Sequence, residues 1–153
     1  MNFAQQSAKH LRDVFFGGNW TTTNVREVLL DVDWRTATTK VDSFNTLVAL
    51  TYHIGYFVTA QLQVMRENKL DAHDKFSFDH PTIRSESDWQ QLKEKVFAEV
   101  EELAAFFEKM EDHQLFDNFM EARYGSYFRN LLGLIEHTHY HLGQIVIIKK
   151  MIG

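Results

Sequence analysis

The stretch YGSYFRNLLGLIEHTHYHLGQIVIIKK, residues 124–150, decides the fold because it predicts one helix with two unlike faces. An α-helix turns by about 100° per residue, so residues four apart lie on the same face. His137 and His141 form such a pair. His139 lies about 200° from His137, on the opposite face. The spacing therefore indicates two histidines that share one site and a third that does not.

The face with His137 and His141 is a polar stripe on a helix that is otherwise rich in Leu, Ile and Val. Ser126, Asn130, Gly133 and Gln144 lie within about 40° of the His137 direction. If this stripe points inward, its polar groups stay unsatisfied unless something binds them. For the histidine pair alone, a solvated helix face is an equally good interpretation.

Three more long helices are predicted from apolar periodicity and from helix stop signals. The first ends at Gly17 and Gly18, and the second is an uncharged segment. With the fourth, they cover roughly residues 3–16, 42–67, 86–110 and 124–150. Helices of these lengths suggest an all-α, antiparallel four-helix bundle, with any site formed in its core by side chains on facing helices.

The connections carry their own signals. Thr21, Thr22 and Thr23 offer N-caps for a short helix that enters VREVLLDV. The segment 68–84 contains Pro81 and has no helical period, so it predicts a long connection between the second and third long helices. Ser85 followed by Asp88 resembles a capping box, which marks the start of the third long helix.

Composition limits the function. The 153 residues are 44% hydrophobic and contain no linker-like tract, which predicts a single domain, 1–153, with a real core. The absence of cysteine excludes disulfides and thiolate ligands, so a transition metal must be held by nitrogen and oxygen. A net charge of -5, with scattered Lys and Arg, argues against nucleic-acid binding.

Neither a signal peptide nor a membrane span is expected. The N-terminus MNFAQQSAKHLRD lacks a basic segment followed by an apolar run. The uncharged stretch between Asp42 and Arg66 is long enough to cross a bilayer, but its Asn, Thr, His and Gln side chains make insertion unfavourable. We therefore expect a cytoplasmic protein whose second long helix is buried inside the bundle.

A third ligand is needed, because Zn²⁺-type ions take at least three protein ligands. His53 is the candidate, since it lies midway along the uncharged helix between Leu50 and Phe57 on its own face. Taken alone, His53 is better explained as a core histidine with a hydrogen-bonding neighbour. Together with the His137 and His141 pair it forms a three-nitrogen constellation, which favours a metal site.

At this point the residues resemble a known family. The segment EHTHYHLGQI is similar to the last helix of the DinB/YfiT-like four-helix metalloproteins, with its His-x-x-x-His-x-Gly-Gln pattern filled by His137, His141, Gly143 and Gln144. The segment LVALTYHIGYF around His53 is similar to the helix that carries the family's third ligand. GNWTTTNVREVLLDV and YGSYFRNLLGLIEH also resemble the family, so the resemblance spans nearly the whole chain.

The resemblance implies a divalent ion, usually nickel or zinc, held by three histidines with open positions, and frequent dimerisation. Characterised relatives include thiol-dependent S-transferases and isomerases, and many members are described as hydrolases without a known substrate. At such a centre a bound water is acidified, or a thiol is held as thiolate. Because the chain has no cysteine, a low-molecular-weight thiol must arrive as a cosubstrate. We expect a small-molecule substrate; a non-catalytic metal-binding or sensing module is the alternative.

Other residues are predicted to lie near the metal site without binding the metal. Gln144 and Asn130 are predicted to orient a ligand's water or the substrate, with helix capping or a hydrogen bond to a ligand side chain as the alternative. Trp20 is a candidate for the pocket mouth, although core packing is the commoner role of a tryptophan. No general base is identified, because Glu136 lies about 100° and Tyr140 about 60° from the ligand face.

The opposite face of the last helix is apolar too. It carries Leu132, Ile135, Leu142 and Val146 at about 140° to 220° from the histidines. A helix that is apolar on nearly all sides is buried on nearly all sides, so this face predicts a homodimer contact. In the alternative, the connection 111–125 or the N-terminal helix covers it within one chain.

Overall fold

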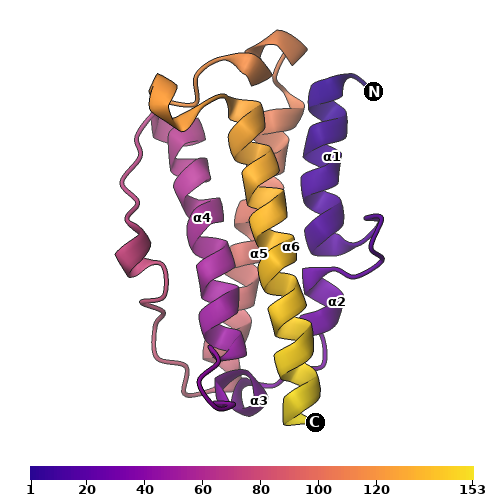
Figure 1. Ribbon diagram of the computed structural model, residues 1–153, viewed down its shortest axis with the longest axis vertical. Helices are drawn as coiled ribbons and strands as arrows, with labels where there is room; N and C mark the ends of the chain where they lie inside the picture. The colour runs from indigo at the N-terminus through magenta and orange to yellow at the C-terminus, as the bar shows by residue number, and fades with distance from the viewer.

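The computed structural model, which describes residues 1–153, is all α-helical, as predicted (Figure 1). Its long helices are α1 (Phe3–Phe16), α4 (Leu47–Glu67), α5 (Glu86–Glu108) and α6 (Tyr127–Ile152). The shorter elements are α2 (Val25–Leu29), α3 (Trp34–Thr38) and the 3-10 turns η1 (Asp74–Phe76), η2 (Asp112–Phe116) and η3 (Ala122–Tyr124). The predicted long connection between α4 and α5 is present and has only η1 within it.

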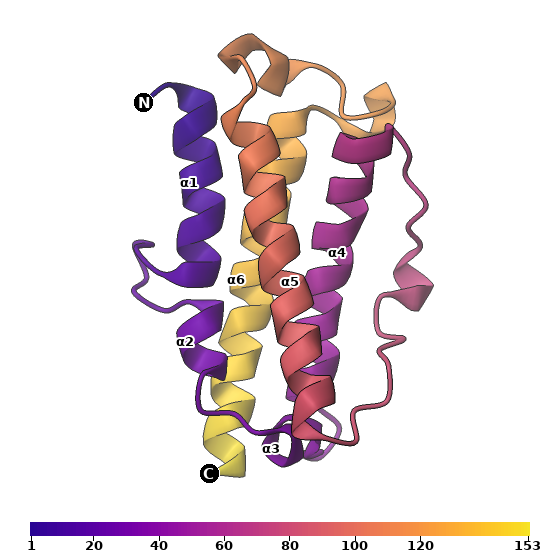
Figure 2. The same ribbon diagram turned by 180° about the vertical axis from the view of Figure 1, so that it is seen from behind.

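The helix directions correct the antiparallel prediction. α4 and α5 run parallel to each other, whereas α1 and α6 run the opposite way (Figures 1 and 2). The reason is the connection after Glu67, which returns along the length of α4 before α5 begins (Figure 1). A short hairpin would have forced antiparallel neighbours, and this connection is long enough to remove that constraint.

Side-chain caps fix where the helices begin. Asn24, not one of the three preceding threonines, caps α2 by accepting a hydrogen bond from the Glu27 N–H. Thr46 caps α4, so residues 42–46 lie before the helix. Ser85 caps α5 as predicted, and Ser126 caps α6. The second half of the expected capping box differs, because the Asp88 carboxylate accepts from the Arg84 N–H rather than from Ser85.

The core is one apolar cluster of 30 buried residues drawn from all four long helices. Trp89 is fully buried, and its indole N–H donates to the Val32 carbonyl at 2.8 Å. Helices α4 and α5 approach most closely at Gly55, where an added Cβ would lie 2.5 Å from a methyl carbon of Val96. Glycine is therefore needed at this position of α4.

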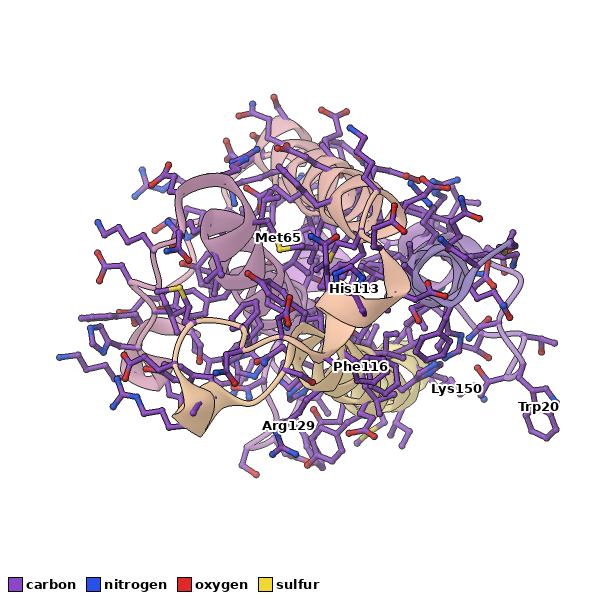
Figure 3. All side chains as sticks on the ribbon, turned by 90° about the horizontal axis from the view of Figure 1, so that it is seen from above. Trp20, Met65, His113, Phe116, Arg129 and Lys150 are labelled. Atoms are coloured by element: carbon purple, nitrogen blue, oxygen red, sulfur yellow. The ribbon has the colours of Figure 1, made fainter.

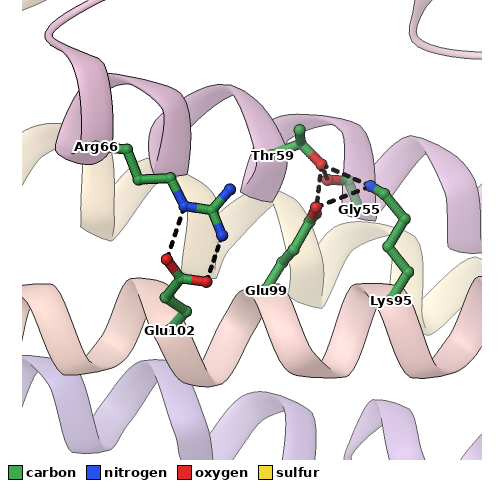
Figure 4. A network of polar contacts seen from close by, with 6 residues as sticks. All are labelled: Gly55, Thr59, Arg66, Lys95, Glu99 and Glu102. Carbon is green, nitrogen blue, oxygen red and sulfur yellow. Dashed lines mark hydrogen bonds and ion pairs between the residues drawn. The ribbon is translucent and has the colours of Figure 1, made fainter.

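Polar contacts on the outside of the same helix pair hold α4 against α5 (Figure 4). Arg66 forms a bidentate ion pair with Glu102. Two turns before Arg66 on α4, the Thr59 hydroxyl donates to Glu99 at 2.5 Å, and Lys95 pairs with Glu99 at 3.0 Å. These contacts fix the register between α5 and the helix that carries His53.

The outer face of α6 differs from the predicted dimer surface. Ile135 and Leu142 are 4% and 2% exposed, because the chain's own core covers them. Val146 is partly buried against that core, and Leu132 is 39% exposed. The alternative of coverage within one chain is therefore correct for Ile135 and Leu142. Along the chain, no helix is both long enough and apolar enough to cross a membrane.

Candidate metal centre

The three predicted ligands come together between α4 and α6. His53 lies on the middle of α4, and His137 and His141 lie one turn apart on α6, which packs against α4. One ring nitrogen from each histidine lies within 4.8 Å of the others. His53 and His141 are each 8% exposed, and His137 is half-buried. The cluster is therefore nearly closed, with His137 as its most accessible member.

Hydrogen bonds orient two of the rings with Nε2 toward the centre. His53 Nδ1 donates to the Ser77 carbonyl at 3.3 Å, and His141 Nδ1 donates to Gln144 Oε1 at 2.7 Å. Each acceptor fixes the proton on Nδ1, which leaves the lone pair on Nε2 free to bind a metal. Gln144 thus hydrogen-bonds one of the candidate ligand side chains, which is the alternative that the sequence left open for it.

His137 completes the centre but lacks such a partner. Its Nε2 lies 3.0 Å from His53 Nε2. Its Nδ1 is buried without a hydrogen bond, and so is the Oε1 of Gln61 on α4. These two atoms are complementary, because a metal on Nε2 keeps the proton on Nδ1, where it needs an acceptor.

The donor set fits a transition-metal ion. Tetrahedral bonds of about 2.0–2.1 Å place ligand nitrogens about 3.4 Å apart. The 3.0 Å between the Nε2 atoms of His53 and His137 is near that value, and one ring nitrogen of His141 lies within 4.8 Å of a nitrogen of each of the other two rings. Three imidazoles leave at least one position open, and nothing in the set discriminates zinc from nickel.

Burial favours the neutral form of His53 and His137. Desolvation, followed by the nearby charges of His141 and His53 when protonated, lowers the pKa of His137 from 6.5 to about 4. Desolvation also lowers the pKa of His53, with a further contribution from His141. Neutral imidazole is the form that binds metals, so the folded chain presents these two rings ready for a cation at neutral pH.

Aromatic side chains enclose the rings. Phe78 stacks on His53 with centroids 4.0 Å apart and planes at 8°. Phe57 contacts His53 and His137 edge-on, at 5.2 and 4.8 Å. Because Ser77 and Phe78 both belong to the connection after α4, that connection holds His53 in place as well as reversing the chain direction.

A groove of about 600 Å³ opens beside the centre, between Phe57 and Gln61 of α4 and residues 128–137 of α6. We call it the α4–α6 groove. His137 is the only one of the three histidines in its wall. A second cavity of about 650 Å³ lies between α4, α5 and the connection, and none of the three histidines lines it. The α4–α6 groove is therefore the approach to the centre.

The remaining predicted residues have mixed outcomes. Asn130 lines the groove, but its amide donates to the carbonyls of Tyr124 and Ser126, so it stabilises the start of α6. Trp20 is 96% exposed in the loop between α1 and α2 and projects away from the bundle, so its predicted place at the pocket mouth is wrong (Figure 3). His139 stays outside the cluster, as predicted.

The sequence prediction missed Ser77, Phe78 and Gln61. The first two lie in an aperiodic connection, where no pattern indicates which residues fold back onto α4. Gln61 lies two turns beyond His53 on the same helix but about 80° around it, so helical spacing did not place it on the ligand face. Comparisons with protein-family models, curated proteins and solved structures found no match.

Proposed function

We propose that this chain is a metal-dependent enzyme of the DinB/YfiT-like kind, in which His53, His137 and His141 hold one nickel or zinc ion. The observation that supports the proposal best is the convergence of three imidazoles, two of them fixed by Nδ1 hydrogen bonds to Ser77 and Gln144. A single core histidine also needs a hydrogen-bonding partner, but the convergence of three rings together with such Nδ1 bonds is typical of metal-binding histidines.

The reaction proposed is S-transfer from a low-molecular-weight thiol, or hydrolysis, on a small molecule. A divalent ion with an open position supplies the Lewis acidity that lowers the pKa of a water or a thiol. The chain's own contribution is to hold the ligands, to exclude bulk water with Phe57 and Phe78, and to leave the α4–α6 groove as the route for substrate.

Metal analysis of protein purified without an affinity tag tests the metal centre. We expect one divalent ion per chain in the wild type, and loss of that ion in His53→Ala and His141→Ala. His139→Ala is the matched control, because it removes a histidine from the same helix but not from the cluster. Undiminished metal in His53→Ala would exclude the centre.

Catalysis is tested with Co²⁺-substituted protein. Addition of a thiol should change the metal-centred visible spectrum, and thiol transfer to electrophiles, or ester and amide hydrolysis, should be lost in His141→Ala. The low exposure of His53 and His141 favours one rival, a non-catalytic metal-binding or sensing module. The non-catalytic module would be established if the metal-centred spectrum responded to neither thiol nor water and the protein turned over no substrate faster than free metal does.

A further inference from the structure

We propose that the α4–α6 groove binds a small organic carboxylate with an apolar body, whose anionic end lies at Arg129 and whose other end reaches the metal centre. This inference deepens the proposed function and rests on it for the second end of the ligand. The groove lies beside α6 for the first three turns of that helix and ends at His137.

Gly133 keeps the groove open. It lies one turn before His137 on the ligand face of α6, and a Cβ added there would meet no atom within 4 Å. Unlike Gly55, this glycine is not required by a neighbouring helix, because the space over it is empty. A ligand that contacts the α6 backbone at Gly133 therefore lies directly beside the metal-binding ring of His137.

The charged side chains on the groove wall determine the orientation in which a ligand binds. Arg129 and Glu136 both line the groove, and neither makes an ion pair or a side-chain hydrogen bond. Seven residues separate them, which is about 10 Å along the helix and only about 20° around it. A carboxylate is attracted to the guanidinium at one end and repelled by Glu136 at the other, so the anion belongs at Arg129, in the first turn of α6.

Between the charges the wall is mainly apolar. Phe57 of α4 and Leu132 and Leu134 of α6 line the groove, which suits a hydrocarbon or aryl body. The buried Gln61 Oε1 adds an acceptor without a partner, whereas the Gln61 amide N–H already donates to the Asn130 carbonyl at 2.8 Å. Few polar groups at defined places in an apolar wall are typical of small-molecule sites.

Binding of 5-phenylpentanoate, followed by amide chemical shifts in ¹⁵N-labelled protein, tests the groove. We expect saturable shifts at residues 57–61 and 128–137, and at least tenfold weaker binding of 5-phenylpentan-1-ol and 5-phenylpentan-1-amine, which have the same body without the anion. Arg129→Gln should weaken the acid about tenfold or more and remove its preference over the alcohol. Arg123→Gln, which removes an exposed arginine paired with Glu121, is the control and should change nothing.

Gly133→Leu should abolish binding of the acid by filling the groove. The matched control is Gly143→Leu. Gly143 also lies on α6, a Cβ added there would meet no atom within 4 Å, and it does not line the groove. Equal binding of acid, alcohol and amine, or unchanged binding in Arg129→Gln or Gly133→Leu, would overturn the inference.

Metal content of each protein separates this inference from the proposed function. Gly133→Leu should keep its metal while it loses the acid, because the substituted side chain points into the groove and not into the histidine cluster. A metal-free wild type that still binds the acid through Arg129 would support the groove and contradict the proposed function. A metal-loaded wild type without preference for the acid would contradict the groove alone.

Discussion

Acidification of the metal-free protein should destabilise it through His137 before its carboxylates protonate. The perturbation is a fall in pH from 8 to 4 in the presence of a chelator. His137 has a pKa of about 4 in the folded chain against 6.5 as its ordinary value, with desolvation as the largest cause. The unfolded chain therefore binds a proton on this ring across an interval where the folded chain does not.

These two pKa values determine the direction of the stability change and the pH range in which it occurs. The free energy of unfolding keeps its full contribution from neutral His137 above pH 6.5 and falls as the pH drops from 6.5 toward 4. Below about pH 4, His137 causes no further decrease. The difference between the two pKa values corresponds to a loss of at most about 3 kcal/mol in the free energy of unfolding. Because the ring is only half-buried, solvent screening reduces the expected loss to about 1–2 kcal/mol. The lowered pKa of His53 acts in the same direction.

Urea unfolding at half-unit pH intervals measures this loss. In His137→Gln, which cannot titrate, the free energy of unfolding should fall by about 1–2 kcal/mol less than in the wild type between pH 6.5 and 4. His113→Gln, an exposed histidine on η2, is the control and should follow the wild type (Figure 3). Carboxylates with lowered pKa values, such as Asp88, contribute mainly below this window. Parallel pH profiles for the wild type and His137→Gln would refute the reasoning.

Further predictions concern packing, ligand orientation and assembly. Gly55→Ala should destabilise the fold by about 1–2 kcal/mol through its clash with Val96, yet stabilise a Val96→Ala background by up to about 1 kcal/mol; thermal unfolding that shows the same sign in both backgrounds contradicts this. Gln144→Ala should weaken metal binding about 10- to 100-fold in competition with a chelator, and unchanged affinity would mean that the hydrogen bond to His141 does not orient the ligand. The homodimer stays a prediction, now placed on the exposed side of α6: light scattering should give a dimer for the wild type and a monomer for Ile147→Glu, and a monomeric wild type refutes it.

Local signals predicted the helices and the convergence of the three histidines well. The i, i+4 spacing of His137 and His141 is a property of one helix, and the uncharged surroundings of His53 marked a buried helix. Both are readable from short stretches of sequence. The choice of cap was less certain, because Asn24 and the threonines before it are all good N-cap residues and the chain path decides between them.

The errors came from features that depend on tertiary structure. The parallel direction of α4 and α5 depends on the path of the connection after Glu67, and composition does not encode that path. The same path brings Ser77 and Phe78 onto His53. Ile135 and Leu142 face the chain's own core because α6 packs against α1 as well as α4, an arrangement that an apolar face alone cannot distinguish from a dimer contact.

The imidazole cluster is poorly explained as a device for stability. Thr138, fully buried on α6, shows one way in which the bundle satisfies a polar side chain: its hydroxyl donates to the Leu134 carbonyl one turn back. His137 Nδ1 and Gln61 Oε1 have no such partner, and an unsatisfied buried group costs about 1–3 kcal/mol. Leucine at these positions would remove that cost. A metal that binds only the folded chain would offset that cost by mass action, and the groove at His137 would then give a small molecule access to the ion, as we propose.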